Sequence, residues 1–125
     1  MKKILLIAAI VVVAGVLFFA LRSDNGATVV NKNADIIYFH GKGCPHCDIV
    51  EEFMKKNGVE EKIKMENSEI FFNKGNAAVF KEKAIACGIT DEKQMGVPLL
   101  WVKGKCYSGD KDIISYFEEQ LNAKK

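Results

Sequence analysis

The longest apolar stretch of the chain begins directly after its basic N-terminus. Residues 4–21 contain no charged or strongly polar side chain. A helix rises about 1.5 Å per residue, so this segment would span about 27 Å, close to the thickness of a bilayer core. The stretch exceeds the apolar core of a cleaved signal, and its bulky end lacks the small residues of a cleavage site. The pattern predicts a signal anchor, a transmembrane helix within residues 1–22. A cleaved signal and a buried helix are the alternatives.

The charges that flank this segment predict its orientation. Lys2, Lys3 and the amino terminus precede it, and Arg22 follows it. The positive-inside rule places the more basic end in the cytoplasm. We therefore expect a single-pass protein of the cell membrane with a cytoplasmic N-terminus. Residues 23–125 would lie outside the cytoplasm, for example in a periplasm, where disulfides persist.

Beyond the apolar segment the pattern changes twice. Residues 23–34 are small, polar and turn-prone, which predicts a linker, and residues 35–125 have the spacing of one folded domain. The first predicted elements are a buried strand at 36–39, a helix from Cys44 to about Lys56 and a weak strand at 63–70. A helix from Asn76 to Cys87 and a β-hairpin of 98–102 and 105–107 follow. Asp110 is predicted to cap the last helix, which runs to about Leu121. The order β-α-β-α-β-β-α predicts an α/β domain whose mixed four-stranded sheet is flanked by helices.

Composition and charge narrow the classes of function. The chain has 125 residues, enough for one domain, with 18 basic and 16 acidic side chains. Three of the basic residues lie in or beside the apolar segment, so the rest of the chain is close to neutral and lacks the basic surface of a nucleic-acid-binding protein. The 49% hydrophobic content excludes a disordered chain, and the lack of a repeat excludes a solenoid.

The sequence Cys44-Pro45-His46-Cys47 carries the candidate chemistry. A cysteine at a helix N-cap directs its sulfur at free backbone N–H groups and at the positive end of the helix dipole. Protonated His46 adds a positive charge, and Pro45 removes an N–H that has no partner at the first helical position. Thiolate, the attacking species in disulfide exchange, is thereby favoured at Cys44. Cys47, one turn further on, is placed to resolve a mixed disulfide.

Three other uses of this cysteine pair compete with redox chemistry. A structural zinc ion needs four ligands, and only His40 and His46 could add to the two thiolates. A copper or other soft-metal carrier would use Cys44 and Cys47 alone. A structural disulfide closing so short a loop would contribute little stability. We expect a redox-active Cys44–Cys47 disulfide with no metal and no other cofactor, and the soft-metal carrier is the alternative function.

Three motifs in this order resemble the thioredoxin superfamily over about residues 35–121. They are the strand followed by Cys-Pro-His-Cys, the Gly96-Val97-Pro98 sequence before a strand, and Ser108-Gly109-Asp110, which resembles the turn before the last helix of glutaredoxins. The resemblance implies a compact thioredoxin-like fold in which the bond before Pro98 is cis and Pro98 lies against the cysteine pair. The small size is more similar to glutaredoxins than to thioredoxins, and the Pro-His dipeptide is that of DsbA-type disulfide-forming enzymes.

The same resemblance implies a substrate site. Val97 would offer its backbone groups to an extended client chain. A glutathione site of the glutaredoxin kind would use Lys42, Val97, Gly109 and Asp110, although Ser108 replaces a glycine in this motif.

The chain departs from the family pattern on the strand before the cysteines. Thioredoxins and DsbA-type enzymes hold a buried acid six residues before the first cysteine, where it helps to deprotonate the second. Tyr38 stands at that position, with His40 or water as the substitute, and Gly43 stands where thioredoxins carry tryptophan. The departure bears on how the second cysteine loses its proton.

Cys87 and Cys106 form the second pair of cysteines. The simplest expectation is two buried apolar thiols. A second disulfide, worth about 3 kcal/mol if unstrained, and a second redox relay are the alternatives.

Together these patterns predict a membrane-anchored thiol–disulfide oxidoreductase that acts outside the cytoplasm. Its expected catalytic residues are Cys44, Pro45, His46, Cys47 and Pro98, and its expected substrate-binding residues are Lys42, Val97, Gly109 and Asp110. The expected partners are cysteine-containing client proteins, a membrane or thiol electron-transfer partner, glutathione, and the membrane through residues 4–21, but no nucleic acid.

Overall fold

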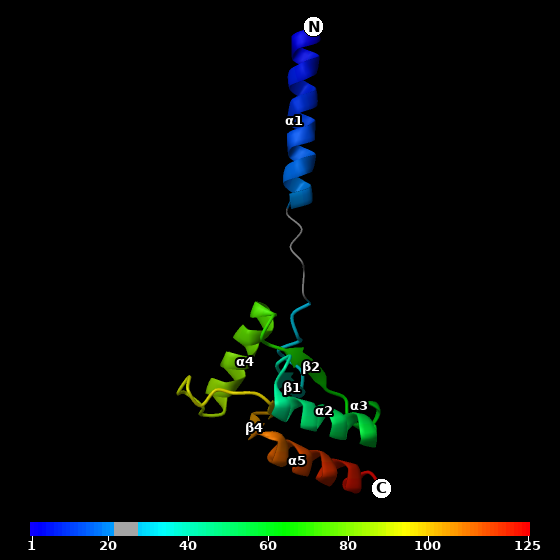
Figure 1. The fold of residues 1–125 in the computed structure, drawn as a ribbon, viewed down its shortest axis with the longest axis vertical. Coiled ribbons are helices and arrows are strands. Elements are labelled where there is room, and N and C mark those ends of the chain that lie inside the picture. Colours follow the sequence, from blue (N-terminus) through cyan, green and yellow to red (C-terminus); the bar gives the residue numbers. More distant parts are fainter. Residues whose placement is uncertain (22–27) are drawn as a thin grey trace.

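The structure is a computed structural model of the whole chain and describes residues 1–21, without the side chains of 17–21, and residues 28–125. Its elements are α1 (Lys2–Leu21), β1 (Ile36–His40), α2 (Pro45–Asn57), α3 (Val59–Lys62), β2 (Glu66–Glu69), α4 (Lys74–Ala86), β3 (Leu99–Val102), β4 (Lys105–Ser108) and α5 (Asp110–Ala123) (Figure 1). The predicted β-α-β-α-β-β-α order is confirmed, with α3 as an additional short helix.

The N-terminal segment forms α1, as its apolar sequence predicts. Within the described residues, which leave out the side chains of 17–21, no helix is both long enough and apolar enough to span a membrane. The first residues of the predicted linker, with Arg22 before them, lie outside the described residues. Its last residues contact the domain: Val30 is buried, and its N–H donates to Asn76 Oδ1 at 2.8 Å.

The predicted mixed four-stranded sheet is confirmed, with the strand order β2-β1-β3-β4. Strand β1 pairs with β2 in parallel and with β3 antiparallel, and β3 and β4 form the antiparallel hairpin. Ile37, Tyr38 and Phe39 in the middle of β1 are fully buried. A strand buried on both faces needs such a continuous apolar run.

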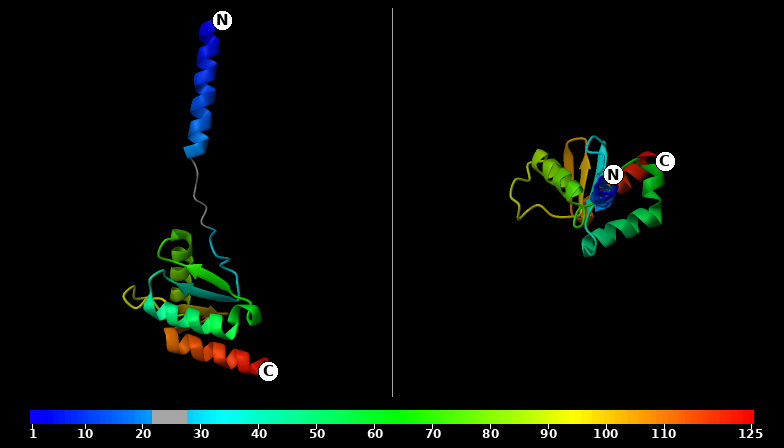
Figure 2. Two further views of the ribbon diagram at one scale, coloured as in Figure 1. Left: turned by 45° about the vertical axis from the view of Figure 1, so that its right-hand side comes forward. Right: turned by 90° about the horizontal axis from the view of Figure 1, so that it is seen from above.

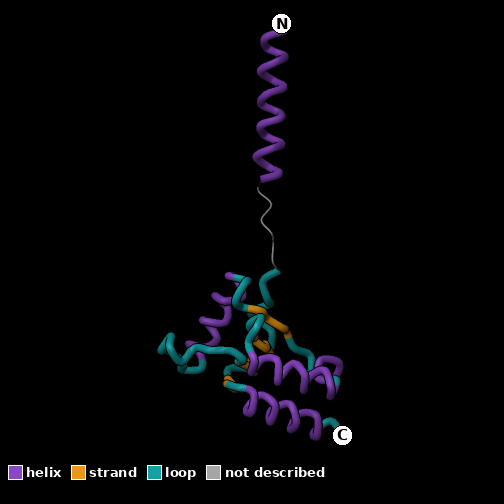
Figure 3. Tube along the Cα trace, viewed as in Figure 1, coloured by secondary structure: helices purple, strands orange, loops and turns teal. Residues whose placement is uncertain are grey.

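Helices cover both faces of this sheet. Successive strand residues point to opposite faces, so Tyr38 packs with α2 and α5, and Ile37 and Phe39 pack with α4. The view from above shows the sheet between α4 on one side and α2 and α5 on the other (Figure 2). Helices α2 and α5 run side by side, so the start of α2 lies beside the start of α5 (Figure 3).

Two helix starts differ from the sequence prediction. Helix α4 begins at Lys74, before the predicted start, because Asn73 caps it: the Asn73 side chain accepts the backbone N–H of Asn76 at 3.1 Å. The predicted capping of the last helix by Asp110 is wrong. Gly109 is the N-cap of α5 and makes no side-chain cap hydrogen bond, because the Asp110 carboxylate lies against His46 instead.

Candidate active site

The start of α2 holds Cys44 in the predicted N-cap position. Cys44 has extended backbone angles, φ −90° and ψ 110°, and Pro45 begins the helix. The backbone N–H of Cys47 donates to Cys44 Sγ at 3.2 Å, and the N–H of Cys44 donates to the Gly41 carbonyl at 3.1 Å. The Cys44 sulfur therefore lies where helix N–H groups and the helix dipole stabilise negative charge.

The two sulfurs of the pair form a disulfide and differ in access. Cys44 and Cys47 are bonded, with their Cα atoms 5.2 Å apart. Cys44 is partly exposed, whereas Cys47 is completely buried. A thiol that approaches from solvent meets Cys44 first, and Cys47 is protected from direct attack.

His46 and Asp110 form a polar pair beside the disulfide. His46 Nδ1 lies 3.3 Å from Asp110 Oδ1, and the His46 side chain is 69% exposed. The pair joins the start of α2 to the start of α5, and it becomes an ion pair when the imidazole is protonated. Packing of α5 beside α2 thus brings Asp110, predicted to bind substrate, to the disulfide end of the domain.

The Val97-Pro98 segment lies on another side of the disulfide. The Val97–Pro98 peptide bond is cis, as the family resemblance implies. The Val97 carbonyl oxygen is 3.7 Å from Cys44 Sγ, and the Pro98 carbonyl accepts the Gly109 N–H at 3.0 Å. Three of the predicted site residues, Val97, Pro98 and Gly109, are thus brought together next to Cys44.

Lys42 is placed differently from the other predicted site residues. Its side chain is exposed, and its backbone N–H donates to Glu69 Oε1 at 3.2 Å. Within the described residues, no hydrogen bond or ion pair joins the Lys42 side chain to Cys44. Lys42 therefore contributes to the site through its backbone N–H, which ties the loop before Cys44 to Glu69.

Glu69 fixes that loop and was not found from the sequence. Its carboxylate accepts the backbone N–H groups of Lys42, Phe71 at 2.8 Å and Phe72 at 2.9 Å. Desolvation opposes ionisation of Glu69, but these three donors, with the nearby His40, outweigh it and lower the pKa of the carboxyl. The aromatic ring of Phe71 lies directly against Gly41, where a Cβ atom would overlap it. No local pattern reveals this role, because the donors come from two separate loops.

Tyr38 lies beneath the buried cysteine. It is completely buried, and its OH donates to the Cys47 carbonyl at 3.3 Å. Burial, with the nearby carboxylates of Glu51 and Asp48, raises the pKa of the Tyr38 phenol far above its usual value. The sequence identified Tyr38 as a departure from the family pattern but not as a hydrogen-bond donor to the active-site helix.

The second cysteine pair also forms a disulfide. Cys87 and Cys106 are bonded, with Cα atoms 5.9 Å apart, so the expectation of two unpaired thiols is wrong. Cys87 is the C-cap of α4, and Cys106 lies on β4, at the edge of the sheet that α4 covers. Sequence spacing alone could not place these two elements within disulfide range.

The alternative function, a soft-metal carrier, depends on side chains that could bind a metal ion. Across residues 1–21 and 28–125, no group of three or more His, Cys, Asp or Glu side chains is arranged to hold a metal ion.

Similarity to known proteins is found among solved structures, at 17% to 23% identity. No family model and no curated protein matches the chain. It is similar to a solved structure of a mutant of the thioredoxin-like protein BC3987, with 23% identity, 70% of this chain and 95% of that chain covered, and a TM-score of 0.48. It is also similar to oxidized glutaredoxin 2 from Chlamydomonas reinhardtii (17% identity, 72% and 77% covered, TM-score 0.48) and to a buckwheat glutaredoxin–glutathione complex (17%, 71% and 74%, TM-score 0.47). Function is inferred below from the chemistry of the Cys44–Cys47 site.

Proposed function

We propose that this protein is a thiol–disulfide oxidoreductase that exchanges disulfides with cysteine-containing client proteins. One observation carries the proposal: a partly exposed sulfur at a helix N-terminus, Cys44, is bonded to a completely buried one, Cys47. Helix N–H groups stabilise a thiolate at Cys44, which makes it both an effective nucleophile and an effective leaving group. The pair holds the redox equivalents itself, so the proposal includes no metal and no other cofactor.

The exchange takes place in two thiol–disulfide steps. In the oxidised protein, a client thiolate attacks Cys44 Sγ, a bond forms between the two sulfurs, and Cys47 leaves with the electron pair of the broken bond. A second client thiolate then attacks the client sulfur of this mixed disulfide, and Cys44 leaves as a thiolate. The client gains a disulfide and the protein becomes a dithiol. The reverse sequence reduces a client disulfide.

The surroundings of Cys44 support an extended or small thiol substrate. The Val97 carbonyl beside Cys44 Sγ provides a backbone acceptor for a client chain. Gly109 and Asp110 lie at the same end of the domain, since Gly109 bonds Pro98 and Asp110 contacts His46. In this proposal Lys42, Val97, Gly109 and Asp110 bind the client or glutathione, and a membrane or thiol partner renews the redox state of the pair.

The location of the domain is part of the proposal and rests on the sequence. Residues 4–21 lack charges, and more basic groups flank this segment directly on its N-terminal side (Lys2, Lys3 and the amino terminus) than on its C-terminal side (Arg22). We place it in the membrane, with the domain outside the cytoplasm. A second disulfide, Cys87–Cys106, agrees with a compartment in which disulfides persist.

The test uses the full chain and a synthetic peptide with one intramolecular disulfide, together with a thiol reductant. The chain should catalyse repeated reduction of the peptide. Cys47→Ser, reduced and then mixed with the peptide after the reductant is removed, should accumulate a mixed disulfide between Cys44 and the peptide, visible by mass spectrometry, because it lacks the sulfur that releases the peptide. Ser115→Ala, which changes an exposed side chain on α5, is the control and should leave turnover intact.

A carrier of soft metal ions would give a different result. It would bind Cu(I) tightly through the reduced pair and would accelerate peptide reduction no more than a buffer blank. In that case Cys47→Ser would lose metal and trap no peptide, and the oxidoreductase proposal would be rejected.

A further inference from the structure

The segment that presents Val97 to Cys44 has little regular structure of its own. Residues 88–97, called here the Val97 segment, lead from the end of α4 toward β3 and contain no helix or strand. Each of these residues is exposed or only partly buried. In Figure 1 the segment is the yellow loop that extends from the end of α4. The Val97 carbonyl nevertheless lies 3.7 Å from Cys44 Sγ, so contacts at the ends of the segment must hold it in place.

The contacts within the Val97 segment are mostly local. At its start, the Ile89 N–H donates to the Ala84 carbonyl in the last turn of α4 at 3.0 Å. In its middle, backbone hydrogen bonds join residues 91–95 to one another and form a turn. Lys81 Nζ lies 2.7 Å from a Glu92 carboxylate oxygen, but both side chains are exposed, and such ion pairs contribute little. The position of the segment therefore depends on how its two ends are anchored.

The second disulfide closes a ring that contains this segment. Cys87 directly precedes the segment, and it is bonded to Cys106 on β4. Three residues after Cys106, the Gly109 N–H donates to the Pro98 carbonyl at 3.0 Å. Pro98 directly follows Val97, which ends the segment. The ring thus runs along the segment, across this hydrogen bond, back along β4 and through the disulfide.

Opening the disulfide would release one side of this ring. Cys106 would stay in place, because β4 pairs with β3 and Cys106 lies opposite Trp101. Cys87 is the C-cap of α4, and the last turn of a helix frays readily when no tertiary contact holds it. The start of the segment would then move with this helix end, and Val97 would be held from the Pro98 side alone.

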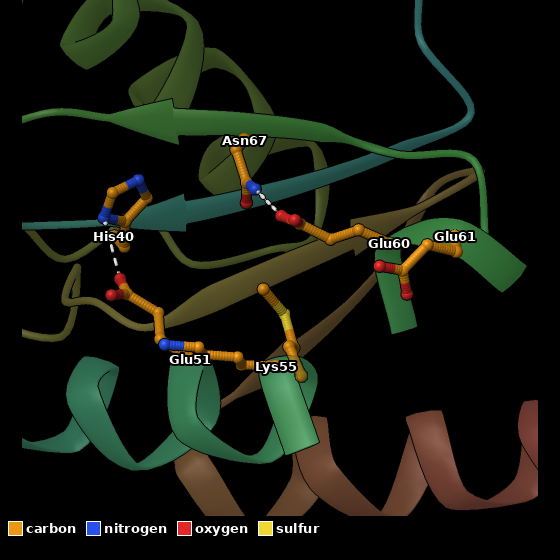
Figure 4. Close-up of a pocket in the computed structure, with 7 residues that line it drawn as sticks. His40, Glu51, Lys55, Glu60, Glu61 and Asn67 are labelled. Atoms are coloured by element: carbon orange, nitrogen blue, oxygen red, sulfur yellow. Dashed lines mark hydrogen bonds and ion pairs between the residues drawn. The ribbon is translucent and has the colours of Figure 1, made fainter. Parts of the chain in front are cut away.

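The start of α2 is held by contacts outside this ring. The Cys47 N–H donates to Cys44 Sγ within α2 itself. His40 Nδ1 lies 3.1 Å from Glu51 Oε1 and joins the end of β1 to α2. Figure 4 shows these two side chains pointing toward one another in a cavity between β1, α2 and α3. These contacts remain when the second disulfide opens, so the reactivity of Cys44 should not change.

We propose, resting on the function proposed above, that the Cys87–Cys106 disulfide positions the Val97 segment for binding of an extended client chain. In this role the bond determines how tightly a peptide is held beside Cys44, and it leaves the chemistry of the exchange unchanged. Cys87 and Cys106 are therefore positioning residues. The role requires their bond to stay closed during turnover, so it involves no redox change at this pair.

Two disulfide substrates separate positioning from chemistry. The Cys44–Cys47 pair of the full chain is opened in a glutathione buffer, freed of glutathione, and mixed with excess substrate in a rapid-quench instrument. Mass spectrometry of the starting protein confirms that Cys87–Cys106 is still bonded. One substrate is a synthetic peptide with one intramolecular disulfide, whose backbone can bond the Val97 carbonyl. The other is hydroxyethyl disulfide, which has no peptide backbone.

The double substitution Cys87→Ala and Cys106→Ala should affect the peptide alone. Its second-order rate with the peptide should fall at least about fivefold, while its rate with hydroxyethyl disulfide should change less than about twofold. At saturating peptide the limiting rate should equal that of the unsubstituted chain, because the lost interaction is one of binding. Hydrogen exchange should also become faster at the Ile89 amide, which is bonded to the fraying end of α4.

Val59→Ala is the matched control for a loss of stability. Val59 is completely buried in the cluster on the α2 side of the sheet, so its truncation destabilises the domain without touching the ring. All proteins are compared at a temperature at which circular dichroism shows each of them to be folded. Both rates of Val59→Ala should equal those of the unsubstituted chain.

Three results would overturn the positioning role of the second disulfide. They are an unchanged peptide rate in the double variant, an equal loss of both rates in that variant, and the same peptide-selective loss in Val59→Ala. Each leaves the proposed function standing, because the unsubstituted chain still reduces both substrates. Failure of the unsubstituted chain with both substrates would reject the proposed function, and the positioning role with it.

Discussion

The two disulfides of this domain lie at opposite ends of their helices, one at a helix N-terminus and the other at a helix C-terminus. Cys44–Cys47 spans three residues at the N-terminus of α2, where a backbone N–H donates to Cys44 Sγ. Cys87–Cys106 spans 19 residues and starts at the C-cap of α4, where Cys106 Sγ lies 3.9 Å from the Lys83 carbonyl. The first sulfur faces the positive end of a helix, and the second pair faces the negative end.

This contrast separates a reactive disulfide from a structural one. Helix N–H groups stabilise the thiolate that forms when Cys44–Cys47 opens, so opening that bond costs less. Helix carbonyls destabilise a thiolate in the second pair, so opening the Cys87–Cys106 bond costs more free energy. Cys87–Cys106 also closes a longer loop than Cys44–Cys47 does, so it removes more conformational entropy from the unfolded chain.

The largest expected effect is on turnover. Cys44→Ser removes the attacking sulfur and should reduce peptide-disulfide turnover by at least about 1,000-fold, because the remaining sulfur at this helix start, Cys47, is completely buried. The double substitution Cys87→Ala and Cys106→Ala should retain turnover at a temperature where it is folded. Comparable losses in both proteins would remove the distinction between the pairs.

The second effect is on stability. Loss of the Cys87–Cys106 bond should lower the free energy of unfolding by about 3 kcal/mol, because the bond closes a long loop. Opening Cys44–Cys47 alone should change it much less. Denaturant titration of each form, with circular dichroism as the signal, measures both values. A larger loss from the first pair would contradict the assignment of structural and reactive roles.

A third effect concerns thiol reactivity. In the fully reduced chain at pH 6, Cys44 should react with iodoacetamide at least about tenfold faster than Cys87 or Cys106, since thiolate is the reacting species. Quenched samples analysed by peptide mapping give the rate at each site. Equal rates at the three cysteines would show that the helix ends do not tune them.

The smallest effect tests the loop before Cys44. Glu69→Gln keeps the shape of the side chain but weakens its bonds to three backbone N–H groups. Because solvent screens this site, the change should cost at most about 1 kcal/mol of stability near neutral pH. Denaturant titration at a series of pH values measures this cost.

The pH dependence of that cost follows from the pKa of the carboxyl. Because the folded-state pKa of Glu69 is lowered, its contribution is present above the pKa of the unfolded carboxyl and is lost as pH falls through the folded-state value. The difference between Glu69→Gln and the unsubstituted chain should therefore shrink below about pH 4. A difference that is constant with pH would argue against the ionised carboxylate.

Local sequence signals were sufficient for most of the framework and for the centre of the site. The apolar run around Tyr38 predicts a strand buried on both faces, and Cys44 followed by Pro45 predicts a helix start with a sulfur at the N-cap. Both features depend on neighbouring residues alone. The turn at Lys103-Gly104 predicts the pairing of the last two strands, whereas no local pattern orders the other strands of the sheet.

Long-range contacts could not be predicted in this way. The Asp110 side chain was expected to cap its own helix, but packing of α5 beside α2 brings it to His46. Glu69 and the Cys87–Cys106 bond depend on the distance between segments that are far apart in the chain. Such distances follow from the packing of α4 and the sheet, which no local pattern specifies.

The most direct test of the central claim is the equilibrium of both disulfides in glutathione buffers. The full chain is equilibrated over a range of potentials, and thiols at each cysteine are counted by alkylation and mass spectrometry. Cys44–Cys47 should open within the range of known exchange enzymes, about −120 to −270 mV, while Cys87–Cys106 should stay closed to below about −300 mV. A value near the less negative end would make the protein an oxidant of its clients, and one near the more negative end a reductant. If the two pairs open together, or if Cys87–Cys106 opens first, the assignment of Cys44–Cys47 as the reactive pair is contradicted.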